Sequence, residues 1–192
     1  FTAHLCLSAV RSVFPKRLDD IIAAGSLRFF AESDTAAWLN HAAATRFSWL
    51  AVATGLSTAF LFYVLGRSGW WHHRFSVMAA SQMLAGFALY ALGYTHSLLL
   101  MAAAFSIIGA NLGVAFFSSV YYGTTNPDRK HGRSAINEGV VGAGGIAGSF
   151  GFALTGAYFG MQVPYFAMPI LIVGIIIFQF ILIRKRTVSP RP

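Results

Sequence analysis

Long uncharged stretches, separated by short groups of charged residues, dominate the chain. Twenty uncharged residues separate Arg46 from Arg67, 53 separate Arg74 from Asp128, and 45 separate Glu138 from Arg184. A helix of about 20 residues covers the roughly 30 Å hydrocarbon core of a bilayer, so the first stretch predicts one membrane-spanning helix and the other two predict two each. Polar, glycine-containing breaks at 93–97 and 160–164 separate the helices within each long stretch. The predicted helices cover 47–66, 75–94, 97–122, 134–159 and 163–183.

Helices are favoured over the strands of a membrane barrel. A barrel strand alternates lipid-facing and lumen-facing residues over about ten positions. The runs Leu-Leu-Leu at 98–100 and Ile-Ile-Ile at 175–177 do not alternate. They are apolar on every side, as helices surrounded by lipid are. The predicted fold class is therefore an all-α, polytopic membrane protein.

The beginning of the chain and residues 19–46 complete the predicted organisation. The opening stretch is apolar but starts at Phe1 without the basic start of a signal peptide, so we interpret it as a truncated transmembrane helix and the chain as a fragment. Residues 19–46 mix charged and apolar positions and predict an external loop or an interfacial segment. The predicted domains are the truncated helix at 1–18, the external segment at 19–46, a five-helix transmembrane bundle at 47–184 and a cytoplasmic tail at 185–192.

Composition supports the membrane interpretation. The chain of 192 residues is 56% hydrophobic and only 10% charged, whereas soluble domains carry about 25% charged residues. So few charges argue against a water-soluble globule, and the apolar content with its 18 Phe excludes a disordered chain; the mean hydropathy is +0.63. The 14 basic and 6 acidic residues give a net charge of +8, but the basic residues lie at the ends of apolar runs. We therefore expect the lipid bilayer, and not nucleic acid, as the partner of these charges.

The basic residues also predict the orientation. With five spans, the connection at 67–74, the connection at 123–133 and the tail from 184 fall on one side of the membrane. All nine basic residues from position 67 onward lie on that side: Arg67, Arg74, Arg129, Lys130, Arg133, Arg184, Lys185, Arg186 and Arg191. By the positive-inside rule this side is cytoplasmic, so we expect a multi-pass protein of the cell (inner or plasma) membrane with a cytoplasmic C-terminus.

Glu138 is the first candidate for function, because an ionisable residue within a membrane span is a functional hypothesis. It follows Asn137 near the start of the predicted helix and indicates proton coupling or contact with a cationic substrate. In the structural alternative, Ser134 caps the helix and the helix dipole stabilises the acid, or Glu138 pairs with Arg129 or Arg133.

Arg11 is the second candidate. It either binds an anionic group in a cavity or extends to water from the end of its helix. Uncharged polar residues form fainter stripes at helical spacing, namely Thr54, Ser57 and Thr58 on one helix and Asn111 and Ser118 on another. These residues either line a water-filled path or bond to neighbouring helices and to their own backbone.

Glycine is concentrated in the helix predicted at 134–159. Gly144 and Gly148 form a small-x-x-x-small pair, and Gly151 continues the same face. Small residues let two helix backbones approach closely in lipid, so these positions predict tight helix packing. A smooth interface of this kind can also slide or rock.

Enzyme chemistry has little support in the sequence. The six histidines and the single Cys6 form no metal-ligand pattern, so we expect neither a metal nor another cofactor. A nucleophile elbow and a phosphate-binding loop are both absent from the sequence. An intramembrane Ser–His pair would need a histidine in the middle of a span, and none is expected there.

The pattern resembles the C-terminal half of a major facilitator superfamily (MFS) transporter. Residues 66–74 (GRSGWWHHR) are similar to the cytoplasmic Gly-Arg…Arg loop between the eighth and ninth helices of that family, through Gly66, Arg67 and Arg74, although the usual Asp and second Gly are lacking. Residues 126–133 (NPDRKHGR), followed by AINEG, are similar to its tenth-to-eleventh connection. Residues 11–16 (RSVFPK) resemble the outer end of its seventh helix.

The resemblance implies a carrier of two six-helix halves, in which a small-molecule substrate binds between the halves and rocking alternates access. The helices at 1–18, 47–66, 97–122 and 134–159 would face the cavity or the missing N-terminal half, and the other two would face lipid. Ser81 and Gln82, on a helix assigned to lipid, have no role in this scheme. We expect a secondary transporter with Arg11 and Glu138 in its path; the alternatives are a membrane scaffold or sensor, and an intramembrane enzyme.

Overall fold

The computed structural model describes residues 1–27, 43–72, 74–124 and 130–188. These parts of the chain form six helices and no strand: α1 (Thr2–Ala23), α2 (Ala43–Arg67), α3 (Phe75–Tyr94), α4 (Leu98–Thr124), α5 (Lys130–Phe159) and α6 (Val163–Val188). Five segments are long and apolar enough to cross a membrane: Ala44–Arg67, Phe75–Tyr94, Leu98–Gly123, Ala135–Phe159 and Val163–Lys185. The prediction of an all-α, polytopic membrane protein is confirmed.

The helices extend beyond the apolar stretches from which they were predicted. Helix α1 continues to Ala23, past the exposed Asp19 and Asp20, and α5 begins at Lys130 rather than near 134. A charged residue ends the lipid-compatible stretch but does not end a helix, because the helical backbone is equally satisfied in water. Residues 28–42 of the predicted external segment and residues 189–192 of the predicted tail lie outside the described residues.

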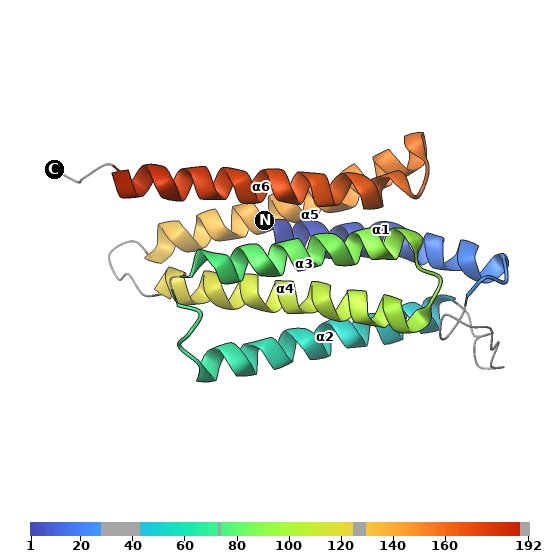
Figure 1. The fold of residues 1–192 in the computed structure, drawn as a ribbon, viewed down its shortest axis with the longest axis horizontal. Helices are drawn as coiled ribbons and strands as arrows, with labels where there is room; N and C mark the ends of the chain where they lie inside the picture. Colours follow the sequence, from blue (N-terminus) through green and yellow to red (C-terminus); the bar gives the residue numbers. More distant parts are fainter. Residues whose placement is uncertain (28–42, 73, 125–129, 189–192) are drawn as a thin grey trace.

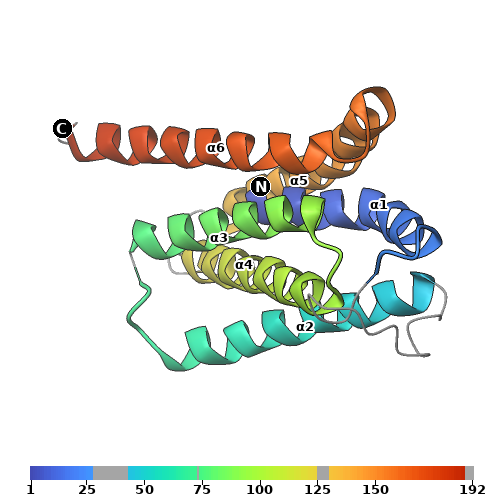
Figure 2. The same ribbon diagram turned by 45° about the vertical axis from the view of Figure 1, so that its right-hand side comes forward.

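Successive helices run in alternating directions, so the connections gather at the two ends of the bundle (Figure 1). The ends of α2, α4 and α6 lie together at the left of Figure 1, and the turns after α3 and α5 lie at the right. The most extensive helix contacts are between α2 and α4 and between α1 and α5, and each pair is parallel. Figure 2 shows α3 between α4 and α6, both of which it contacts.

Two pairs of glycines allow the parallel helices to approach closely. A Cβ at Gly109 or Gly113 of α4 would lie less than 3.0 Å from atoms of α2. A Cβ at Gly144 or Gly148 of α5 would lie less than 3.0 Å from the backbone at the start of α1, at Phe1 and Leu5 respectively. Each pair is spaced four residues apart, so both glycines of a pair lie on one helix face. Backbone-to-backbone packing of this kind is how helices associate in lipid.

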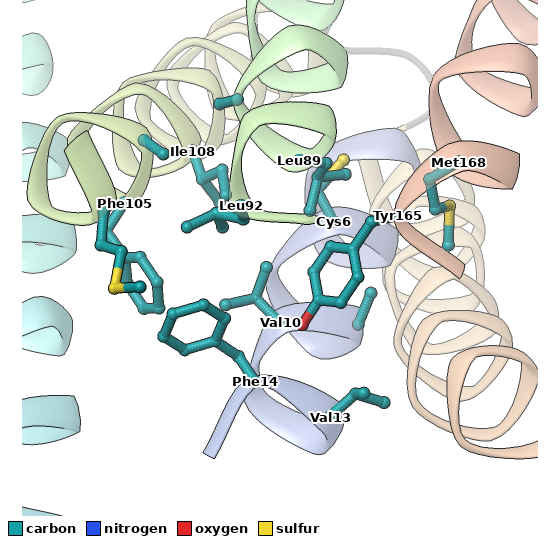
Figure 3. Close-up of a cluster of buried hydrophobic side chains, with 14 of the residues drawn as sticks. Cys6, Val10, Val13, Phe14, Leu89, Leu92, Phe105, Ile108, Tyr165 and Met168 are labelled. Atoms are coloured by element: carbon teal, nitrogen blue, oxygen red, sulfur yellow. The ribbon is translucent and has the colours of Figure 1, made fainter. Parts of the chain in front are cut away.

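The buried core lies between α1, α3, α4 and α6 (Figure 3). Phe14 of α1 meets Phe105 of α4 edge to face, with 5.0 Å between ring centroids. Tyr165 of α6 is fully buried and its ring lies against α1. The outside of the bundle is also strongly apolar: Trp49 is 71% exposed and Ile170 is 75% exposed. An apolar exterior of this extent suits a bilayer rather than water.

Candidate functional site

A polar stripe runs along the exposed face of α1. His4, Ser8 and Arg11 are spaced four and three residues apart and therefore share one face. Arg11 is exposed, and His4 and Ser8 are half-buried, whereas Cys6 on the opposite face is fully buried. An exposed arginine facing lipid is costly, so this face suits water or a protein partner.

The packing of α1 against α5 sets the depth of each residue in the stripe. Phe1 lies beside Gly144, Leu5 beside Gly148 and Val13 beside Gly156. By this register His4 is level with position 147, the midpoint of the apolar segment Ala135–Phe159. This level was not readable from the sequence, since the depth of α1 is set by its contact with α5 and not by its own ten-residue apolar run.

Arg11 lies nearer to the end of the bundle. In the same register it is level with position 154, five residues before the end of α5 and therefore about 8 Å from it. Both interpretations made from the sequence remain compatible with this position. A guanidinium here can reach water at the helix end, and it can also contact an anionic group between helices.

Glu138 is exposed on α5, and Asn137 beside it is half-buried. The helix begins at Lys130, so Ser134 lies inside it and does not cap it, and Glu138 is in its third turn. The helix dipole acts mainly within the first turn, which weakens the dipole explanation for this acid. Arg129 and the side chains of Arg133 and Ser134 lie outside the described residues.

His4 is the residue of the α1 stripe that lies near Glu138 of α5. His4 lies within electrostatic range of both Arg11 and Glu138. His4 therefore lies between a basic group toward one end of the α1–α5 pair and an acidic group toward the other. Sequence reasoning missed His4 and Ser8, although their spacing from Arg11 was a usable signal.

The hydroxyl groups on α2 make contacts between helices. Thr54 donates to the carbonyl oxygen of Phe105 at 3.2 Å, and Thr58 donates to that of Gly109 at 2.8 Å. Ser57 donates to the carbonyl oxygen of Thr54 within its own helix. These contacts correspond to the packing alternative that the sequence left open.

Asn111 and Ser118 on α4 are almost completely buried, at 1% and 2% exposure. Asn111 faces α3, where Ser81 donates to its Oδ1 at 3.2 Å. This bond gives Ser81 a role that the sequence did not predict. Ser118 lines a separate hollow that also contains Arg74. Asn111 is therefore bonded to α3, and the hollow beside Ser118 is also lined by α3, so neither residue is placed with the stripe on α1.

The three glycines predicted for packing behave differently. Gly144 and Gly148 lie against the backbone of α1, at Phe1 and Leu5. Gly151 is exposed, and a Cβ there would meet nothing within 4 Å among the described residues. Gly151 continues the motif in sequence but lies outside this contact.

The basic connection between α2 and α3 is held in place by an aromatic group. Trp71 is buried, and its indole N–H donates to the carbonyl oxygens of Leu65 at 2.9 Å and Ser68 at 2.7 Å. Arg67 donates to the hydroxyl of Tyr63. Gly66 and Arg74 are exposed at the two ends of this connection.

Arg17 is the charged residue most completely built into the fold among those described on α1. It is 6% exposed, and it donates from Nε to the carbonyl oxygen of Leu92 at 2.9 Å and from Nη2 to that of Gly93 at 2.6 Å. Its guanidinium also lies 5.6 Å from the ring centroid of Tyr165. Sequence analysis missed this contact because the partners are about 75 residues away in the chain.

No family model, curated protein or solved structure matches this chain. The described residues contain no group of three His, Cys, Asp or Glu side chains placed to hold a metal ion.

Proposed function

We propose that this chain is one half of a secondary transporter of the major facilitator type, which moves a small solute by alternating access. The observation that carries the proposal is the way in which two units of three helices pack against each other. Units α1–α3 and α4–α6 run in opposite directions, and the middle helix of each packs in parallel on the first helix of the other, α2 on α4 and α5 on α1. Inverted three-helix repeats within each half are a feature of these carriers.

The polar groups beside the α1–α5 contact support a path for the solute. His4 lies in the middle of the bundle, and Arg11 and Glu138 lie toward its two ends. Charged groups at membrane depth usually face a protein interior or a water-filled cavity. We infer that this face meets the N-terminal half of the carrier, and that His4 and Glu138 move a proton while Arg11 attracts an anionic group.

The same proposal includes an orientation. From position 67 onward, the basic residues whose side chains are described, Arg67, Arg74, Arg184 and Lys185, lie at the end of the bundle where α6 ends. The positive-inside rule makes this end cytoplasmic in a cell membrane. The C-terminus of the chain would then be cytoplasmic, and the turns after α3 and α5 would face outward.

Water access to the stripe tests the proposal without knowledge of the solute. In the full-length protein with Cys6 replaced by alanine, Ser8→Cys should react with a membrane-impermeant thiol reagent, because a carrier path is open to water. Ile170→Cys is the matched control, since it lies at a similar distance from the same end of the bundle on the exposed face of α6. If Ser8→Cys is as unreactive as Ile170→Cys, the carrier proposal fails.

A further inference from the structure

A groove of about 520 Å³ lies on the outside of the bundle between α2, α3 and α4. Its walls are mainly aliphatic, with Leu61 from α2, Leu84 from α3 and Ile107 and Val114 from α4. Leu84 is 55% exposed, so the groove opens outward, onto the surface that lipid covers. It lies away from the polar stripe of α1.

One end of the groove is basic. Arg74 lines it, is exposed and occupies the N-cap position of α3. Trp70, 52% exposed, lines the same end. The N-terminus of a helix attracts phosphate through its free N–H groups and its dipole, and tryptophan is enriched at membrane interfaces. This end therefore combines an anion-binding side chain, a helix N-terminus and an interfacial anchor.

An unpaired amide lies deeper in the groove. Ser81 is seven residues after Arg74 along α3, which places it about 10 Å deeper. Its hydroxyl shares its proton between the carbonyl oxygen of Met78 at 2.9 Å and Oδ1 of Asn111 at 3.2 Å, and Nδ2 of Asn111 has no hydrogen-bond partner in the part of the chain that the structure describes. Asn111 is 1% exposed and lines the groove. A buried donor without an acceptor costs free energy, which an acceptor on a bound molecule would recover.

We propose that this groove binds an anionic phospholipid. The phosphate contacts Arg74 and the N-terminus of α3, and an acyl chain lies along Leu84 and Ile107. An ester carbonyl accepts a hydrogen bond from Nδ2 of Asn111 when the side chains that cover this buried amide move aside. The order of these groups with depth matches a phospholipid, which carries its anion at the surface, its ester carbonyls below and its hydrocarbon deepest. A free phosphate would leave the amide and the aliphatic walls without a role.

Lipid binding by the purified full-length protein tests this inference. Native mass spectrometry should detect a bound dioleoylphosphatidylglycerol that is retained more strongly than dioleoylphosphatidylcholine. Arg74→Gln should weaken retention about fivefold, the contribution expected of one basic residue near an anionic surface. Asn111→Leu should weaken lipid retention about threefold, which is the change in affinity expected when one hydrogen bond is lost in a membrane protein. The Arg74→Lys variant keeps the positive charge and should retain the anionic lipid nearly as strongly as the unchanged protein does.

Arg67→Gln is the matched control, because it removes the same charge from the same connection but lies outside the groove walls. Its lipid retention should stay unchanged. Equal losses from Arg67→Gln and Arg74→Gln would show non-specific charge attraction and overturn the inference, as would displacement of the lipid by soluble glycerol phosphate. Gel filtration and the thermal midpoint identify any variant that fails to fold. If the Asn111→Leu variant fails to fold, the Arg74→Gln variant still tests the proposal, because Arg74 is exposed. Unchanged lipid retention by Arg74→Gln would then refute the proposal by itself.

Discussion

Arg17 of α1 and Gly93 of α3 are joined by a hydrogen bond of 2.6 Å from the guanidinium Nη2 to the carbonyl oxygen. A second bond reaches the carbonyl oxygen of Leu92, and the ring of Tyr165 of α6 lies beside the same guanidinium. The last carbonyls of a helix have no partner within it, and a basic side chain can satisfy them. Arg17 thus connects three helices at the end of the bundle opposite to the end of α6.

Replacing Arg17 should destabilise this end of the bundle. Arg17→Met leaves two carbonyl oxygens of α3 unpaired, and we expect the free energy of unfolding to fall by about 2 kcal/mol, the contribution of hydrogen bonds to a charged group. Unfolding in mixed detergent micelles measures the change. Lys16→Met removes a charge from the exposed neighbouring position and should leave stability unchanged. Equal effects of the two variants would contradict the role given to Arg17.

Alanine substitutions of two neighbouring glycines should differ sharply. A Cβ at Gly148 would lie less than 3.0 Å from the backbone of Leu5, so Gly148→Ala must push α1 and α5 apart at a cost of about 1–3 kcal/mol. A Cβ at Gly151 meets nothing within 4 Å among the described residues, so Gly151→Ala should be neutral or stabilising by up to about 1 kcal/mol. Thermal unfolding in detergent compares them. A destabilising Gly151→Ala would instead place a partner on that face.

Thr54 and Thr58 offer a test between packing and a solute path. Thr54→Val and Thr58→Val each remove one hydrogen bond to α4 and should lower the free energy of unfolding by about 0.6 kcal/mol. Transport by the full-length protein should persist, because both hydroxyls are occupied by the neighbouring helix. Loss of transport with unchanged stability would show that these residues line the path.

Glu138 and Arg11 should be needed for transport itself. In proteoliposomes with a pH gradient, a panel of sugars, amino acids and organic ions identifies a solute whose uptake the full-length protein supports. We expect Glu138→Gln and Arg11→Ala to reduce this uptake at least tenfold, because both residues are exposed beside the α1–α5 contact. Ser48→Ala is the control, since the exposed Ser48 bonds only within its own helix, to the carbonyl oxygen of Ala44, among the described residues. Unchanged uptake in both variants would remove Glu138 and Arg11 from the path.

Cysteine labelling in sealed cells tests the orientation. Gly69→Cys, in the connection between α2 and α3, should be protected from an impermeant reagent, and His96→Cys, in the turn after α3, should react. Both positions are exposed, so accessibility reports the side of the membrane and not burial. Reaction of both from outside would contradict the alternating topology, and reversed reactivity would contradict the cytoplasmic assignment.

The helices were predictable from the sequence because the bilayer sets a length for each segment separately. The stretch between Arg46 and Arg67 is as long as the hydrocarbon core is thick, and α2 occupies it. The end of α1 was less predictable. Its last turns carry Asp19 and Asp20, which mark the limit of the apolar stretch but not the limit of the helix.

The sequence by itself determined the number, the approximate position and the alternating direction of the spanning helices, since these follow from hydropathy and chain order. Only the tertiary structure decided which polar residues meet: it pairs Arg17 with carbonyls of α3, turns Thr54 toward α4, joins Asn111 to Ser81 and sets His4 level with the middle of α5. The reason is that hydropathy is almost unchanged when a helix in lipid rotates about its axis or slides along it. Contacts such as those of Gly148 with Leu5 fix the rotation and the depth, and those contacts join residues far apart in the chain.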